Sequence, residues 1–342
     1  MVAMSNFKKI VALLLVAVCL ISVAACGKNE KADVTTTAPA ANHEDKEIPD
    51  VEVTVPDRGE NKIKIAAPAD SGGLAFSKLA IDCSYAYSVE QKGITSATAA
   101  EKIKNGEAQV AALTLADAAA LSSQADIKII AINTNLVLSV VASGEGILSC
   151  EELDGKTIYA CGEGTYVQWV TEKILDDNGV DADIVYATVD EIDAKMKSGE
   201  AEICILPEFD GTGLTNANEG FTKKFPLTSL WKEDFAPAAT CVVARTDYVE
   251  ANTGYIEELV EKFEMATNSC IDNEAGVGYL AQILTENGYF SDFELAKKSV
   301  AAVGFVYLDG EEMKAAFEAN VDFYADCGAE ITAPADSAYY GI

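Results

Sequence analysis

Basic residues are scarce in this chain. Its 342 residues include 25 Lys and Arg against 55 Asp and Glu, which gives a formal net charge of −30. Proteins that bind the phosphate backbone of nucleic acids need clustered Lys and Arg, so the composition excludes nucleic acid as a partner. Arginine occurs only at Arg58 and Arg245. A bidentate arginine clamp on a phosphate or sulfonate group is therefore almost unavailable.

Histidine and several common catalytic motifs are also missing. His43 is the only histidine, and because we place it outside the folded body, we expect no Ser-His-Asp, Cys-His or His-rich metal site. The sequence contains no P-loop, so any ATPase that works with this protein must be another chain. We expect no catalytic residue, no metal and no cofactor. Carboxylate-pair chemistry of the glycosidase kind is the enzymatic alternative that remains open.

The nine cysteines include no CxxC pair. Cys161 and Cys204 lie in apolar, strand-like runs, where a free cysteine behaves as a small hydrophobic residue. One or two disulfides among the other cysteines are the alternative. The hydrophobic fraction of 49% is ample for a core, and the length favours two compact units.

Residues 1–25 have the pattern of an export signal. Two lysines precede an apolar run at 10–21 that is short for a membrane span. The sequence Val-Ala-Ala-Cys-Gly at 23–27 resembles a bacterial lipobox. The resemblance implies that Cys26 is lipidated and anchors the protein to the cell membrane of a bacterium, on the extracytoplasmic side. An ordinary secretory signal with a coincidental cysteine is the alternative.

We predict that residues 26–60 form the lipidated Cys26 followed by a disordered tether. The segment is charged, rich in Thr, Ala and Pro, and has no apolar periodicity. Such a segment cannot bury enough surface to offset the entropy lost on ordering. It contains both His43 and Arg58, so this prediction leaves the folded body without histidine and with one arginine.

A strand–loop–helix plan occurs twice, at a constant offset of 93 residues. The segment KNGEAQV at 104–110 matches KSGEAEI at 197–203, and 63–67 matches 156–160 at the same offset. For the second copy we predict strands at 156–160, 184–187 and 202–206, and helices at 165–178 and 189–197. Strands that alternate with helices of this length favour an α/β fold, with mostly parallel sheets flanked by helices.

We expect two lobes joined by a two-segment hinge. Residues 61–138 form the first part of lobe 1, residues 139–239 form lobe 2, and residues 240–342 return to lobe 1 and add C-terminal helices. Two crossings between lobes suit closure around a ligand. Beyond Arg245 the pattern indicates helices throughout, at 255–269, 274–286, 291–299 and 310–324. Ser291 and Glu294 are predicted to form a capping box for the third of these.

Several ordered segments together resemble an ABC-transporter substrate-binding lipoprotein with the two-lobe type II periplasmic-binding-protein fold. They are GKTIYA at 155–160, GEG at 162–164, GEAEI at 199–203, LPE at 206–208 and CVVAR at 241–245. The resemblance is to the group that serves nitrate, taurine, other sulfonates and thiamine-precursor pyrimidines. It implies a monomer that binds a small molecule and delivers it to a membrane permease driven by a separate ATPase.

Candidate ligand-binding residues follow the predicted strands, because ligands of open α/β sheets bind at the carboxyl ends of strands. They are Asp70, Ser71, Gly72, Thr114, Thr134, Gly162, Glu163, Gly164, Thr165, Tyr166, Pro207 and Glu208. The loop at 162–165 precedes a helix, whose free N–H groups favour an anion or a polar oxygen. A plain tight turn there, and an N-cap role for Asp70 or Ser71, are the structural alternatives.

If Asp70, Glu163 and Glu208 converge, the cleft is acidic and repels anions. The composition then favours a ligand with amino or ring N–H donors, such as an amine or a pyrimidine-like heterocycle. A small oxyanion or sulfonate is the alternative ligand. An extracellular ligand-sensing domain that signals without transport is the alternative function.

Overall fold

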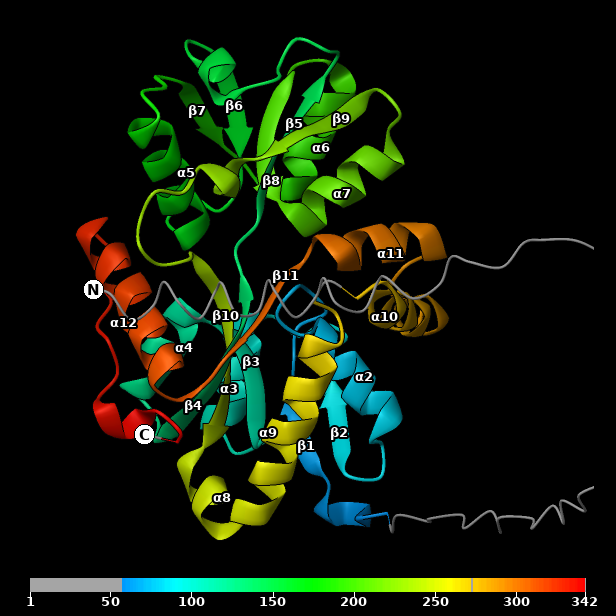
Figure 1. The fold of residues 1–342 in the computed structure, drawn as a ribbon, viewed down its shortest axis with the longest axis vertical. Coiled ribbons are helices and arrows are strands. Elements are labelled where there is room, and N and C mark those ends of the chain that lie inside the picture. The colour runs from blue at the N-terminus through cyan, green and yellow to red at the C-terminus, as the bar shows by residue number, and fades with distance from the viewer. Residues whose placement is uncertain (1–56, 272, 342) are drawn as a thin grey trace, which may run out of the picture. The chain divides into compact units, whose positions relative to one another are not determined.

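The computed structural model describes residues 57–271 and 273–341. The predicted signal at 1–25, Cys26 and most of the predicted tether lie outside the described residues. Two sheets, each flanked by helices, form the two lobes (Figure 1). No helix of the described part is both long and apolar enough to cross a membrane.

The sheet of lobe 1 has six strands. They are β1 (Ile63–Ala66), β2 (Tyr87–Glu90), β3 (Val110–Thr114), β4 (Ile127–Asn135), β10 (Ala238–Arg245) and β11 (Gly304–Leu308). Their order across the sheet is β11-β4-β10-β3-β1-β2. β1 pairs in parallel with β2 and β3, whereas β10 is antiparallel to β3 and β4, and β11 is antiparallel to β4. Strands β1 to β4 therefore share one direction.

The sheet of lobe 2 repeats this arrangement with five strands. They are β5 (Leu138–Ser143), β6 (Thr157–Ala160), β7 (Asp183–Tyr186), β8 (Ile203–Pro207) and β9 (Phe221–Pro226). Their order is β7-β6-β8-β5-β9, and β5 alone runs against the other strands. In both lobes, a strand of the crossing chain, β10 or β5, pairs antiparallel with the third strand of the repeat.

Helices follow the strands at corresponding places in the two copies. Lobe 1 has α2 (Leu74–Asp82), α3 (Ser96–Lys104) and α4 (Leu115–Ser122), and lobe 2 has α5 (Tyr166–Asp177), α6 (Val189–Ser198) and α7 (Glu208–Ala217). The chain turns after α3 at Gly106 and after α6 at Gly199, each with a φ of +76°. This left-handed conformation favours glycine, so the repeated Gly-Glu-Ala segment marks the same helix end twice. The predicted duplication is confirmed.

The remaining elements complete lobe 1 and the connections. The C-terminal helices are α8 (Thr246–Ala251), α9 (Thr253–Asn268), α10 (Glu274–Glu286), α11 (Phe293–Ala302) and α12 (Gly310–Asp326). Short 3₁₀ helices are η1 (Gly59–Asn61), η2 (Cys150–Leu153), η3 (Leu227–Leu230) and η4 (Asp336–Ala338). The chain enters lobe 2 between β4 and β5 and returns between η3 and β10 (Figure 1).

Two details of the C-terminal region differ from the sequence prediction. The chain beyond Arg245 is not wholly helical, because Gly304–Leu308 forms the edge strand β11 on β4. A short apolar run does not distinguish a strand from a helix, and the pairing with β4 decides it here. Asp292, not Ser291, caps α11, since its carboxylate accepts the Leu295 N–H at 2.9 Å.

Arg58 corrects the predicted extent of the tether. Its guanidinium forms an ion pair with Glu258 of α9 and lies 4.0 Å from the centre of the Tyr255 ring. Its backbone N–H donates to the Tyr85 carbonyl at 2.9 Å. Arg58 therefore belongs to the folded body, which has two arginines instead of one. The partner is 200 residues away in sequence, so no local pattern indicates it.

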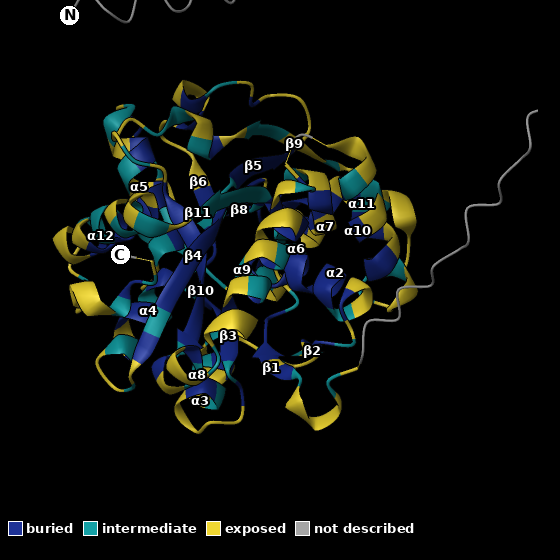
Figure 2. Ribbon diagram, turned by 60° about the horizontal axis from the view of Figure 1, so that its bottom comes forward, coloured by how far each residue is buried: buried dark blue, intermediate teal, exposed yellow. Residues whose placement is uncertain are grey.

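Buried strands form the core of each lobe. In lobe 1, β10 and β4 lie between helices on both sides and are buried along most of their length (Figure 2). The seven described cysteines are all free, and six of them are buried. The described part thus contains no disulfide, and cysteine acts there mainly as a small apolar residue.

Candidate ligand-binding cleft

The loops after β1, β6 and β8 approach one another between the lobes. A small cavity of about 40 Å³ is lined by Ser71 from lobe 1 and by Tyr166, Pro207 and Glu208 from lobe 2. These residues come from the predicted set, and the two copies of the repeat supply them. The carboxyl ends of the strands in both sheets therefore meet at one inter-lobe site, as expected for α/β folds.

Asp70 of lobe 1 and Asp210 of lobe 2 place two carboxylates near each other across this site. Burial, together with the nearby charge of Asp70, raises the pKa of Asp210 to about 6. Asp70 remains in contact with solvent in the cleft, but protein surrounds it closely enough that burial raises its pKa as well. No Lys or Arg of the described residues contributes to either shift. No cation of the described residues therefore compensates the pair.

Hydrogen bonds fix the loop that carries Asp70. The Asp70 carboxylate accepts the Gly72 N–H at 3.0 Å, and the Gly73 N–H donates to the Asp70 carbonyl at 3.1 Å. The Gly72 carbonyl accepts the side-chain amide of Asn133 at 2.7 Å. One carboxylate oxygen of Asp70 thus helps to turn the loop at the start of α2, and this turn presents the carboxyl group to the cleft.

Thr134 lies in β4 and its partner Thr240 in β10, the two strands at which the chain crosses between the lobes. It is buried, and its hydroxyl shares a hydrogen bond of 2.5 Å with the hydroxyl of Thr240. Thr240 in turn donates to Asn133 at 2.9 Å. Thr134 therefore supports the Asp70 loop through Thr240 and Asn133, and its position does not expose it to a ligand.

Thr114 is committed to the start of α4. Its hydroxyl accepts the Asp117 N–H at 3.1 Å and donates to the Asp117 carboxylate at 2.9 Å. Its own N–H donates to the Ser96 hydroxyl at 2.9 Å. These bonds are those of an N-cap residue, so the hydroxyl of Thr114 has no free hydrogen atom for a ligand in this structure.

The loop before α5 uses most of its polar groups internally. Thr165 caps the helix, because its hydroxyl donates to the Gly162 carbonyl at 2.6 Å and accepts the Val167 N–H at 3.3 Å. The Gly164 N–H donates to the side chain of Gln168 at 2.7 Å. Since these N–H groups already have partners, the loop offers less to an anion than its sequence indicated.

Tyr166 is the aromatic residue of this cleft. Burial raises the pKa of its hydroxyl, and the charges of Asp70 and Asp210 add to the effect. Both acids therefore lie near the phenol. Its ring lies 6.3 Å from that of Tyr324 in α12. Tyr166 therefore supplies both a flat apolar surface and a hydroxyl next to the carboxylate pair.

Glu208 lines the inter-lobe cavity, but its carboxylate is neutralised from within lobe 2. It is buried, forms an ion pair with Lys223 and accepts hydrogen bonds from Ser139 and from Thr212, the last at 2.9 Å. Asp210, which the sequence analysis missed, lines a neighbouring hollow of about 260 Å³ with Phe209 and Phe290. Residues two apart on a helix point about 200° apart. When Glu208 faces the core of lobe 2, Asp210 consequently faces away from it.

Glu163 occupies the rim of lobe 2. It is exposed and lines a hollow of about 600 Å³ with Cys161, Tyr186 and Glu191, at the carboxyl ends of β6 and β7. The three acids predicted to converge are thus spread out: Asp70 lies in the loop after β1, Glu163 lines the rim of lobe 2, and Glu208 lines the inter-lobe cavity while paired with Lys223. The acids whose pKa shifts include no contribution from a cation of the described residues are Asp70 and Asp210.

Acidic side chains also dominate the hollows around the cleft. The cavity at Tyr166 and three neighbouring hollows of about 710, 600 and 260 Å³ are lined by no Lys or Arg of the described residues. The acids that line them are Asp117, Glu163, Asp190, Glu191, Asp193, Glu208, Asp210 and Glu330. Electrostatic complementarity favours a cationic or N–H-rich ligand in such surroundings. The described residues include no group of His, Cys, Asp and Glu suited to a metal ion.

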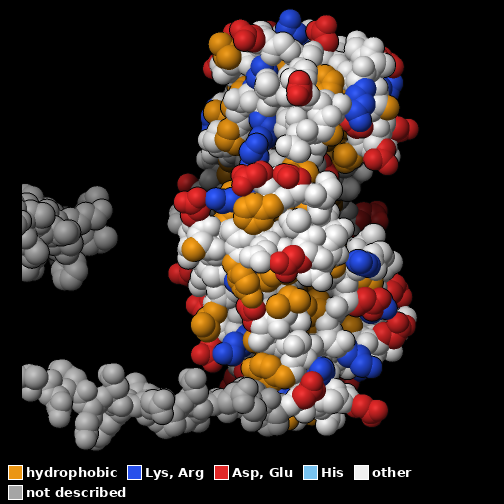
Figure 3. Space-filling model, turned by 90° about the vertical axis from the view of Figure 1, so that its right-hand side faces the viewer, with side chains coloured by type: hydrophobic (Ala, Val, Ile, Leu, Met, Phe, Trp, Pro, Cys, Tyr) orange, Lys and Arg blue, Asp and Glu red, His pale blue; other side chains and the backbone are white. Residues whose placement is uncertain are grey.

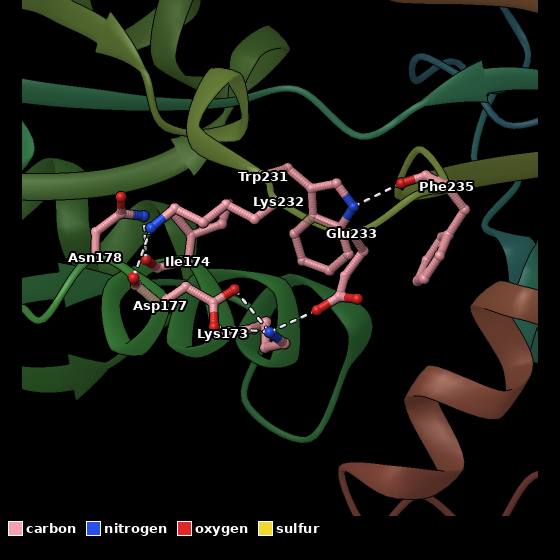
Figure 4. Close-up of polar contacts among 8 residues, drawn as sticks. All are labelled: Lys173, Ile174, Asp177, Asn178, Trp231, Lys232, Glu233 and Phe235. Atoms are coloured by element: carbon pink, nitrogen blue, oxygen red, sulfur yellow. Dashed lines mark hydrogen bonds and ion pairs between the residues drawn. The ribbon is translucent and has the colours of Figure 1, made fainter.

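The returning segment of the hinge is fastened to lobe 2 by polar contacts (Figure 4). Lys173 of α5 pairs with Asp177 and with Glu233, each at 2.6 Å. The Trp231 indole N–H donates to the Phe235 carbonyl at 2.6 Å. The segment from Trp231 to Phe235 is therefore held as a compact turn against α5.

Aromatic contacts join the lobes on the side of α12. The ring of Trp231 lies 5.3 Å from Phe323, and the ring of Trp169 lies 5.4 Å from Tyr324. The tryptophans belong to lobe 2 and their partners to α12 of lobe 1. On the opposite side, Phe209 of α7 meets Phe290, which precedes α11, at 5.5 Å. The lobes thus touch on both sides of the acidic cleft.

Comparisons with known proteins agree with this architecture. The model of the family described as NMT1/THI5 like matches residues 88–276. An ABC transporter structure from Parabacteroides distasonis is 18% identical, with a TM-score of 0.66 over 82% of this chain and 98% of that chain. A search of curated proteins with the sequence returned no match.

Two further solved structures share the fold. The alkanesulfonate-binding protein SsuA from Xanthomonas axonopodis pv. citri, bound to MOPS, is 13% identical, with a TM-score of 0.60 over 82% of this chain and 98% of that chain. The nitrate-binding protein NrtA from Synechocystis PCC 6803 is 15% identical, with a TM-score of 0.55 over 78% and 82%. The predicted type II periplasmic-binding-protein fold is confirmed. The chain belongs to the NMT1/THI5-like family.

Proposed function

We propose that this protein captures a small amine or nitrogen heterocycle between its lobes and delivers it to a membrane permease driven by a separate ATPase. The observation that carries the proposal is the pair Asp70 and Asp210, two nearby acids from opposite lobes whose raised pKa values receive no contribution from a Lys or Arg of the described residues. A ligand with N–H donors would satisfy both carboxylates at once. Closure of the lobes around it would then relieve their mutual repulsion.

Tyr166 gives the site a preference for a flat ligand. An aromatic heterocycle can stack on its ring while its amino and ring N–H groups donate to the acids. A sulfonate or nitrate, the ligands named for the SsuA and NrtA structures, would place negative charge against both carboxylates. The N–H groups of Gly164 and Val167, which such an anion would need, already have partners within the loop.

The proposed setting follows from the lipobox-like segment at 23–27. Lipidation of Cys26 would hold a monomeric body beside the membrane on the extracytoplasmic side, within reach of the permease. Mass spectrometry of the protein purified from membranes tests this part independently, since diacylation of Cys26 adds a defined mass. An N-terminus elsewhere in the chain without lipid would contradict it.

A competitive thermal-shift screen tests the ligand class. Aminopyrimidines, alkylamines, nitrate and alkanesulfonates are added to the ligand-free protein at equal concentrations and ionic strength. We expect stabilisation by N–H-rich compounds, because a ligand that binds only the folded state raises the melting temperature. Stabilisation by sulfonates or nitrate alone would overturn the proposal.

A further inference from the structure

A second hollow lies in lobe 1, away from the cleft, and its charge is of the opposite kind. It has a volume of about 390 Å³ and lies between α2 and α9. Both helices contribute a lysine to its wall, Lys78 from α2 and Lys262 from α9. The net charge of the chain is −30, so two lysines in the wall of one hollow contrast with the acidic character of the whole sequence. Its size falls within the range of small-molecule sites, which is roughly 300–1,000 Å³.

Lys78 is unusually buried for a lysine. Only 8% of its surface is exposed. Its ammonium lies 4.4 Å from the centre of the Tyr279 ring, a cation–π contact. Among the described residues no carboxylate forms an ion pair with it. The cation–π contact leaves the ammonium without a counter-ion among the described residues, so Lys78 is suited to an anion that enters from the hollow.

The other charged groups of the hollow do not cancel the attraction of Lys78 for an anion. Lys262 forms no ion pair with the described residues, so its ammonium is available to the same anion. Asp82 also lines the hollow, but its carboxylate accepts a hydrogen bond from the Tyr279 hydroxyl. The two ammonium groups therefore outnumber the one carboxylate at the wall.

An apolar surface accompanies the lysines. Leu79, Met265 and Ala266 line the hollow, and Met265 is 60% exposed. Ile81 of α2 is 49% exposed and Tyr279 of α10 is 40% exposed. Figure 3 shows hydrophobic side chains at the surface of lobe 1 on the side of α10 and α11. Exposed apolar groups beside a charged hollow favour a ligand with both kinds of surface.

We propose that the hollow between α2 and α9 binds a small organic anion that carries a short apolar chain. The anionic group pairs with Lys78 and Lys262, and the chain covers the exposed side chain of Met265.

Isothermal titration calorimetry with hexanoate tests the proposal on the ligand-free protein. Inorganic phosphate serves as an anion without a chain, and hexylamine as a chain without an anion. We expect saturable hexanoate binding that weakens with added salt and exceeds that of phosphate. Lys78→Met should lower the hexanoate affinity at least tenfold, and Lys262→Met several-fold. Lys92→Met, an exposed position outside the hollow, is the matched control and should bind as the parent does.

The variants distinguish binding in the hollow from binding elsewhere on the protein. Hexanoate that binds equally to Lys262→Met and Lys92→Met, or a parent protein with no saturable hexanoate binding, would overturn the proposal. Because Lys262 is partly exposed, that variant tests the site even if Lys78→Met does not fold. Hexanoate binding that becomes markedly tighter in Asp210→Asn would also overturn it, since removal of a repelling carboxylate should favour an anion in the cleft.

Discussion

The inter-lobe cleft and the α2–α9 hollow of lobe 1 carry opposite charge although one strongly acidic chain forms both. Acids alone supply the charged side chains that line the described cleft and its neighbouring hollows, and no cation of the described residues contributes to the raised pKa values of Asp70 and Asp210. The hollow has two lysines and one carboxylate that is already hydrogen-bonded. The net charge of a chain therefore does not predict the ligand of a particular site. What matters is which side chains the fold turns toward it.

The largest expected effect comes from removing one acid of the cleft. Asp210→Asn should weaken binding of an aminopyrimidine at least about 100-fold, because loss of one partner from a buried charge pair costs roughly 2–5 kcal/mol. Hexanoate binding in the hollow should not change. Calorimetry with both ligands measures the two affinities on the same sample.

Asp322→Asn is the matched control for that experiment, since Asp322 is exposed on α12. It should bind both ligands as the parent does. An Asp210→Asn variant that retains full aminopyrimidine affinity would show that the acid pair does not hold the ligand.

Glu208 and Lys223 should affect stability without affecting the cleft. Lys223→Met leaves the buried carboxylate of Glu208 without a cation and should lower the free energy of unfolding by about 3 kcal/mol. Glu208→Gln keeps hydrogen-bonding capacity toward Ser139 and Thr212 and should cost less, about 1–2 kcal/mol. Urea denaturation measures both. Equal loss of ligand affinity in both variants, at a temperature where they are folded, would place Glu208 in the binding site after all.

The raised pKa of Asp210 predicts a pH-dependent stability of the empty protein. Because the folded state holds this proton up to about pH 6 and the unfolded chain loses it near its ordinary pKa, stability falls as the pH rises through this window. Asp210→Asn should therefore stabilise the ligand-free protein by about 1–3 kcal/mol at pH 8 and have little effect below about pH 4. Thermal melts across this range measure the difference.

Ligand binding should have the opposite pH dependence. An N–H-rich ligand needs the ionised carboxylate, so its affinity for the parent should rise about tenfold between pH 5 and pH 7.5. Asp210→Asn should show no such rise. A flat profile in the parent, with a ligand whose own charge is constant over this range, would contradict the assignment of Asp210 to the site.

The smallest expected effect concerns the contact between lobes beside the cleft. Phe209→Ala and Phe290→Ala should show a coupling energy of about 0.5–1.5 kcal/mol in a double-mutant cycle of ligand affinity, the range for aromatic pairs. Calorimetry of the four proteins measures it. Zero coupling would indicate that this contact does not contribute to the ligand-bound, closed state.

Local sequence predicted the repeated elements well because their signals are local. Glycines after α3 and α6, the N-cap Thr165 and the strand–helix alternation each depend on neighbours within a few residues. The matched offset of 93 residues relates the two lobes at the level of the sequence. The resemblance of segments such as 155–160 to a known family predicted how the two lobes combine.

Which residues form the site could not be predicted without the tertiary structure. Glu208 and Asp210 are both acids at the start of one helix, and only the packing of α7 against β5 and β9 decides that Glu208 faces inward to Lys223 while Asp210 faces the cleft. Arg58 forms an ion pair with Glu258, which lies 200 residues further along the chain. The sequence by itself determined the two lobes and the acidic character of the protein, because caps, glycine turns and composition are properties of short segments. Which acids meet and which are neutralised depends on contacts between distant segments, and the tertiary structure alone decided that.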